Sequence, residues 1–64
     1  MPRIAARELL ANPNANLTDL VDAIARLSED KGYLQGRIGF AKTIAETDYL
    51  IGALRDRVRE IENK

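Results

Sequence analysis

The sequence predicts an all-α fold: a short N-terminal helix, followed by a helical hairpin with a long C-terminal helix. Three observations lead to this prediction. Between Arg37 and Ile61, apolar residues recur in sevens, the spacing of a helix that packs along a seam. An Asn-Pro turn and a glycine-rich segment divide the remainder into helix-sized pieces. The chain has 64 residues, so we expect one small domain spanning residues 1–64.

The first predicted helix covers residues 1–11. Pro2 suits its start, because the missing N–H would have no partner there. Residues 12–16, with the sequence Asn-Pro-Asn-Ala-Asn, form a turn, since Pro13 cannot continue a helix and restricts the residue before it. Asn16 is a favourable N-cap for the helix that follows.

The second predicted helix covers residues 17–31 and ends at Lys31, which precedes a glycine. Asp22 and Arg26 form an i,i+4 pair in the favourable order. Apolar residues at helical spacing form one face, which we expect to pack inside the hairpin. This face consists of Leu17, Leu20, Val21, Ile24 and Leu27.

A turn is predicted over residues 32–36, because two of these five residues are glycine. The alternative is one continuous helix from Leu17 to Asn63. In that helix each internal glycine would cost about 1 kcal/mol relative to alanine.

The long third helix is predicted over residues 37–62 and carries two apolar strips. Two strips imply two partners, the chain's own second helix and a second copy of the chain. The strip of mostly small residues is expected to pack within the hairpin, and it comprises Ile38, Ala41, Ala45, Tyr49 and Gly52. The seven-residue repeat is expected to form a coiled-coil seam in a homo-oligomeric helical bundle, through Phe40, Ile44, Thr47, Ile51, Leu54, Val58 and Ile61.

Ten basic residues balance ten acidic ones, and the chain has no Cys and no His. This composition excludes disulfides and the common zinc, haem and iron–sulfur ligand sets, so we expect no cofactor and no metal. A core of this size is marginal alone, which favours oligomerisation. Zero net charge offers no overall attraction to nucleic acid or membranes. We expect a cytoplasmic protein, because the sequence shows neither a signal peptide nor an apolar stretch approaching about 18 residues.

We expect no enzymatic activity. Ser28 is the only serine, and Lys31 lies one helical turn further on, a spacing that could pair a nucleophile with a base. Such a pair is more often part of a solvated helix surface. Glu46 and Asp48 diverge on a helix and form no carboxylate dyad. The glycines match neither a phosphate loop nor a dinucleotide fingerprint. No catalytic residue is therefore predicted.

Residues 3–27, including the run from Glu8 to Leu20 with its Asn-Pro turn, resemble the first two helices of many bacterial helix-turn-helix domains. The resemblance implies a DNA-binding regulator whose recognition helix begins near Ser28. Glu29 and Asp30 would then lie in its first turn, where this family usually meets phosphates and bases. Nucleic acid is therefore an alternative partner and not the expected one.

Ala41-Lys42-Thr43, at the start of the long helix, resembles the helical hairpin of small phage proteins that sequester cyclic nucleotide signals between the subunits of an oligomer. The resemblance implies an anti-defence sponge, with a cyclic nucleotide as ligand. Candidate anion or nucleotide contacts are Arg26, Arg37 and Lys42 for phosphate, and Tyr33, Tyr49 or Phe40 for base stacking.

The function that we predict is that of a small non-enzymatic helical interaction protein: a regulator, adaptor or inhibitor of bacterial or phage type. It would act by homo-oligomerisation and by binding an unidentified protein, with no membrane as a partner. The DNA-binding regulator and the nucleotide sponge are its two alternatives.

Overall fold

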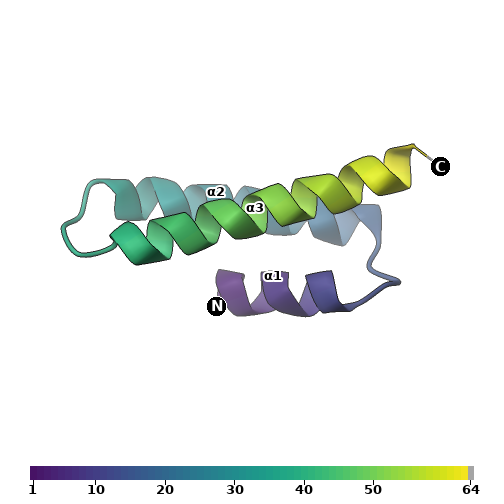
Figure 1. The fold of residues 1–64 in the computed structure, drawn as a ribbon, viewed down its shortest axis with the longest axis horizontal. Helices are drawn as coiled ribbons and strands as arrows, with labels where there is room; N and C mark the ends of the chain where they lie inside the picture. The colour runs from purple at the N-terminus through teal and green to yellow at the C-terminus, as the bar shows by residue number, and fades with distance from the viewer. Residues whose placement is uncertain (64) are drawn as a thin grey trace.

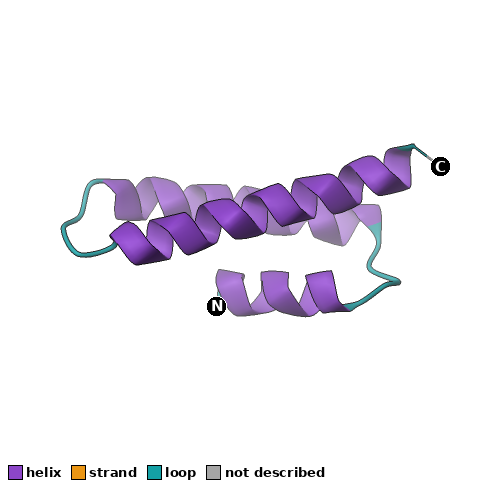
Figure 2. Cartoon of the chain, in the orientation of Figure 1, coloured by secondary structure: helices purple, strands orange, loops and turns teal. Residues whose placement is uncertain are grey.

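The computed structural model describes residues 1–63, which form three α-helices and no strand (Figures 1 and 2). They are α1 (Pro2–Ala11), α2 (Leu17–Gln35) and α3 (Ala41–Glu62). Helices α2 and α3 form an antiparallel hairpin along the 41 Å long axis, and the shorter α1 lies along one side and contacts both. The predicted all-α fold is confirmed, while Lys64 lies outside the described residues.

Asparagine side chains shape the connection between α1 and α2. Asn12 Oδ1 accepts a hydrogen bond from the backbone N–H of Asn14 at 2.9 Å, closing a turn. Asn16 Oδ1 accepts one from the N–H of Asp19 at 2.8 Å, which confirms Asn16 as the N-cap of α2. The chain therefore leaves α1 and enters α2 almost as the sequence predicts.

The turn of the hairpin lies four residues later than predicted, between Gln35 and Ala41. Gly32 is inside α2, and Gly39, at φ 93°, is the only described residue with a positive φ. The reason is Leu34, which is 6% exposed and continues the line of buried leucines. Burying this side chain is worth about 1.5–3 kcal/mol, more than the roughly 1 kcal/mol cost of one glycine in a helix. The predicted turn at 32–36 is therefore wrong.

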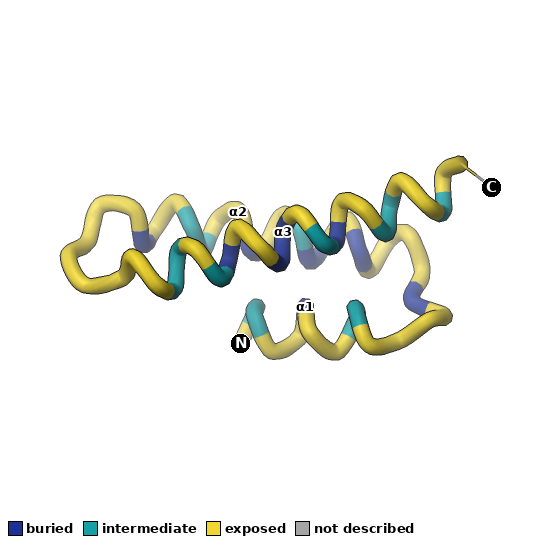
Figure 3. The backbone as a smooth tube through the Cα atoms, in the orientation of Figure 1, coloured by how far each residue is buried: buried dark blue, intermediate teal, exposed yellow. Residues whose placement is uncertain are grey.

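The core lies where the three helices meet (Figure 3). On α2, leucines seven residues apart point into it, and on α3 buried residues recur at three- and four-residue intervals. Ala6 is fully buried on α1, and its small side chain lets this helix approach the hairpin closely. The buried helical residues are Ala6, Leu20, Ala23, Leu27, Leu34, Thr47, Leu50, Ile51 and Leu54.

The apolar face predicted for the second helix is only partly buried. Leu20 and Leu27 are fully buried and Ile24 is half-buried, as expected for packing inside the hairpin. Leu17 and Val21, however, are 39% and 51% exposed, so their predicted burial is wrong. The physical reason is geometric. Helices α1 and α3 cover the side of α2 that carries Leu20 and Leu27. The predicted apolar face of five residues is wider than the area that these two helices cover.

Candidate interaction surfaces

One side of the hairpin is covered by α1, which makes polar contacts with both α2 and α3. Arg3 on α1 pairs with Asp30 on α2 at 2.6 Å, and Arg7 pairs with Glu46 on α3. From α3, the Arg57 guanidinium donates to backbone carbonyls at the end of α1. The contacts reach both arms of the hairpin, so α1 lies over the groove between them.

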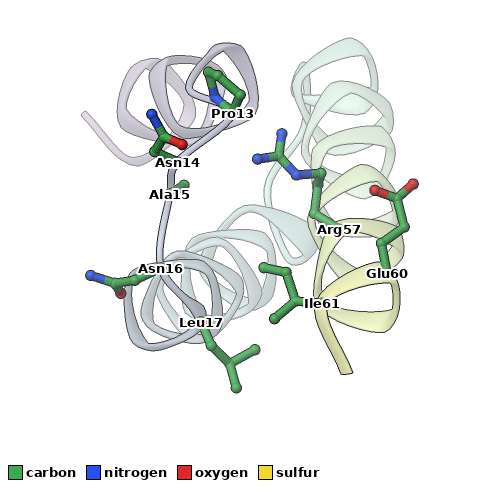
Figure 4. A pocket seen from close by; sticks show the side chains of 8 residues that line it. All are labelled: Pro13, Asn14, Ala15, Asn16, Leu17, Arg57, Glu60 and Ile61. Carbon is green, nitrogen blue, oxygen red and sulfur yellow. The ribbon is translucent and has the colours of Figure 1, made fainter. Parts of the chain in front are cut away.

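The opposite side of the hairpin has no covering helix in the described chain, and we call it the open face. At about 100° per residue, the positions on α2 that point away from α1 follow the spacing of Leu17, Val21 and Ile24. Figure 4 shows the Leu17 side chain directed away from α1. From α3, half-buried Val58 packs against the core. The open face is therefore an aliphatic strip on α2 formed by Leu17, Val21 and Ile24.

The two strips of the long helix do not lie where they were predicted to lie within one chain. Thr47, Ile51 and Leu54 are buried within a single chain. Ile44, Val58 and Ile61 are half-buried, and Phe40 is 38% exposed at the N-cap of α3. The chain's own α1 and α2 thus cover most of the seam that we assigned to a second copy. The strip expected inside the hairpin is exposed throughout: Ile38, Ala41, Ala45, Tyr49 and Gly52.

The candidate nucleotide contacts do not converge in one chain. The Arg37 guanidinium lies over the Tyr33 ring at 4.2 Å from its centre, so these two are neighbours at the turn of the hairpin. Arg26 is paired with Asp22 in the middle of α2, which confirms that predicted pair. Lys42 and Tyr49 are separated by about two turns of α3.

The pairs considered for catalysis are engaged elsewhere. The Ser28 hydroxyl donates to the Ile24 carbonyl at 2.8 Å, and the Lys31 ammonium pairs with Asp48 at 2.5 Å. No group of three or more potential metal ligands occurs among residues 1–63. No helix in this part of the chain is long and apolar enough to cross a membrane.

The helix-turn-helix alternative required a recognition helix that begins near Ser28. Instead, α2 runs without interruption from Leu17 to Gln35, and Ser28 lies in its interior. The predicted element is therefore absent from the described chain, and Glu29 and Asp30 are interior residues of the same helix.

A hollow of about 490 Å³ lies at the end of the bundle, where the connection between α1 and α2 meets α3 (Figure 4). Its charged groups are Arg57, which donates to the carbonyls of Leu10 and Asn12, and exposed Glu60. None of the described buried side-chain polar atoms lacks a hydrogen-bond partner. The lining residues are Pro13, Asn14, Ala15, Asn16, Leu17, Arg57, Glu60 and Ile61.

At the other end of the rod, residues 33–42 form what we call the hairpin tip. Ile38 is fully exposed there, and Tyr33 and Phe40 are also exposed. Sequence reasoning missed this cluster, because it placed Tyr33 in the turn and Ile38 and Phe40 on the long helix. The signal that could have revealed it is the run from Lys31 to Ala45, which contains no Asp or Glu.

Comparison with protein-family models, with curated proteins and with solved structures found no match to this chain.

Proposed function

We propose that this protein is a small non-enzymatic helical interaction protein, which pairs with a second copy of itself through the open face. The observation that supports the proposal is the exposure of Leu17 and Val21 beside half-buried Ile24 on one side of α2. Large aliphatic side chains grouped on one side of a helix are the pattern of an interface core.

The size of the chain favours self-association. A domain this short buries only about 60% of the surface of its unfolded chain, so additional burial contributes strongly to its stability. A standard interface covers roughly 800 Å² on each partner. Out of a total accessible surface of 4612 Å², this is an area that one side of the hairpin can supply.

A second copy is also the simplest occupant by symmetry. In a two-fold dimer the same patch meets itself, so an aliphatic strip finds a matching aliphatic strip without a separately shaped partner. Two hairpins joined in this way would place four long helices around a shared core, as in a helical bundle. The charged residues on α3, such as Arg55 and Glu62, would form the polar rim.

The wider role that we propose is that of a cytoplasmic regulator, adaptor or inhibitor of bacterial or phage type. A dimer of this kind has no need of a catalytic pocket. It presents its remaining surface, including the exposed strip with Ala45, Tyr49 and Gly52, to a protein partner.

Sedimentation equilibrium or light scattering over about a hundredfold range of concentration tests the proposal. We expect the mass to rise from monomer to dimer, and Val21→Lys to abolish the rise. Ile4→Lys is the matched control, because Ile4 on α1 is also 51% exposed and the added charge is the same. A monomer at every concentration, or equal effects of the two substitutions, would refute the proposal.

A further inference from the structure

The hairpin tip carries a concentration of positive charge that the zero net charge of the chain conceals. Residues 31–45 contain Lys31, Arg37 and Lys42 and no acidic residue. Since the whole chain is neutral, the remainder carries a net charge of −3. The turn of the hairpin, at one end of the 41 Å axis (Figure 1), thus carries cations and no carboxylate.

The two cations within the hairpin tip, Arg37 and Lys42, are not compensated by nearby carboxylates. Asp30 and Glu46, which border the acid-free run, are paired with arginines of α1. Asp48 is paired with Lys31 at 2.5 Å. Among the described residues, Arg37 and Lys42 form no ion pair, and the Arg37 guanidinium rests on the Tyr33 ring. Two cations are thus available to an outside partner.

Apolar side chains project from the same place. Ile38 is wholly exposed in a loop flanked by Gly36 and Gly39, where nothing lies within 4 Å of the position of an added Cβ. Phe40 and Tyr33 are exposed on either side of the loop. An isolated aliphatic anchor between cations, with an aromatic ring whose hydroxyl can remain in water, matches the layered chemistry of a membrane surface.

We propose that the hairpin tip docks on an anionic phospholipid surface. Ile38 and Phe40 enter the acyl boundary, while Arg37 and Lys42 lie at the level of the lipid phosphates. The net negative remainder of the chain is repelled by the same surface, so the rod attaches by its tip. This docking does not depend on the dimer proposed above, and it requires no helix that spans the bilayer.

The same features disfavour a nucleic acid as the occupant. Two unpaired cations at the end of a rod can neutralise few phosphates, and an aliphatic side chain such as Ile38 offers no stacking surface for a base. A lipid surface uses both the charges and the isoleucine.

Co-sedimentation with lipid vesicles tests the docking. The purified chain should sediment with vesicles of phosphatidylserine mixed with phosphatidylcholine at low salt, and not with phosphatidylcholine alone. Each of Arg37→Gln and Lys42→Gln should weaken partitioning about fivefold, and raised salt should act in the same direction. Ile38→Ser should weaken it roughly tenfold without altering helicity, since this side chain contacts no core residue.

Two control variants carry matched changes outside the tip. Arg59→Gln removes an exposed cation near the other end of the rod, and Tyr49→Ser removes an exposed aromatic ring from the side of α3. Both should bind vesicles like the parent. Equal losses in the controls, or no binding to anionic vesicles at low salt, would overturn the proposal. So would binding to single-stranded RNA or polyglutamate that is sensitive to Arg37→Gln but indifferent to Ile38→Ser.

Discussion

Arg57 on α3 donates a hydrogen bond from Nη1 to the backbone carbonyl of Leu10, in the last turn of α1, at 3.1 Å. Its Nη2 donates to the carbonyl of Asn12 at 2.8 Å. The final carbonyls of a helix lack partners within the helix, and a cation there also meets the negative end of the helix dipole. A residue 47 positions away thus serves as a C-terminal cap for α1.

We expect Arg57→Ala to loosen α1 more than the hairpin. The substitution removes two charge-assisted hydrogen bonds at a partly exposed site. We expect their loss to lower the free energy of unfolding by about 1–2 kcal/mol. An isolated helix of 10 residues is marginal, so the loss should appear locally. Amide hydrogen exchange should show faster exchange in residues 5–11, with α2 and α3 changed less.

Arg59→Ala provides the matched control for that experiment. Arg59 is exposed on the same helix and only approaches Asp56 at 3.8 Å, a contact worth little in solvent. Amide hydrogen exchange in the Arg59→Ala variant should resemble that of the parent. If both variants behaved alike, the cap would have no energetic importance.

The position of the hairpin turn leads to opposite expectations for two glycines. Gly32 lies inside α2 with nothing within 4 Å of an added Cβ, so Gly32→Ala should raise stability by about 1 kcal/mol. Gly39 is equally uncrowded but has φ 93°, which disfavours any residue with a Cβ, so Gly39→Ala should lower stability by a similar amount. Urea unfolding of the two variants measures both. A turn over 32–36 would predict a loss for Gly32→Ala.

The sequence predicted the seam of α3 but not its partner, and the reason is physical. A seven-residue repeat shows which side of a helix is apolar, whereas the element that covers it depends on where the preceding turn directs the chain. Moving that turn from Gly32 to Gly39 extends α2 by one helical turn and brings Leu34 into the core. The cap at Asn16 was predictable because it depends only on residues three positions apart.

The sequence did not predict the hairpin tip for a related reason. Tyr33 and Arg37 are in contact because α2 continues through residue 33, and Ile38 projects from the loop because α3 begins after it. The zero net charge of the whole chain also conceals the local excess of positive charge in residues 31–45. This excess matters only because the hairpin brings these residues together at one end of the rod.

The core and the open face should respond differently to loss of side-chain volume. Leu27 is fully buried, so Leu27→Ala should cost about 2–5 kcal/mol. A domain of 64 residues has a total stability of only about 3–10 kcal/mol, so this variant should be close to unfolding at room temperature. Val21→Ala, on the open face, should change the stability of the dilute monomer by less than about 0.5 kcal/mol. Thermal unfolding at low concentration compares them, and similar melting temperatures would contradict the burial of Leu27.

Thr47 is the one polar residue buried in the described core, and its hydroxyl donates to the Thr43 carbonyl one turn earlier at 2.7 Å. This carbonyl can still accept the helical N–H bond when the hydroxyl is absent, so Thr47→Val leaves no group unsatisfied. The valine methyl replaces a hydroxyl that gains little from burial, and we expect stability to rise by up to about 1 kcal/mol. Thr47→Ser retains the hydroxyl and loses the methyl group, so it should cost about 1 kcal/mol. Urea unfolding separates the two contributions, and a loss of stability in Thr47→Val would show that the hydroxyl is needed for the packing of α3.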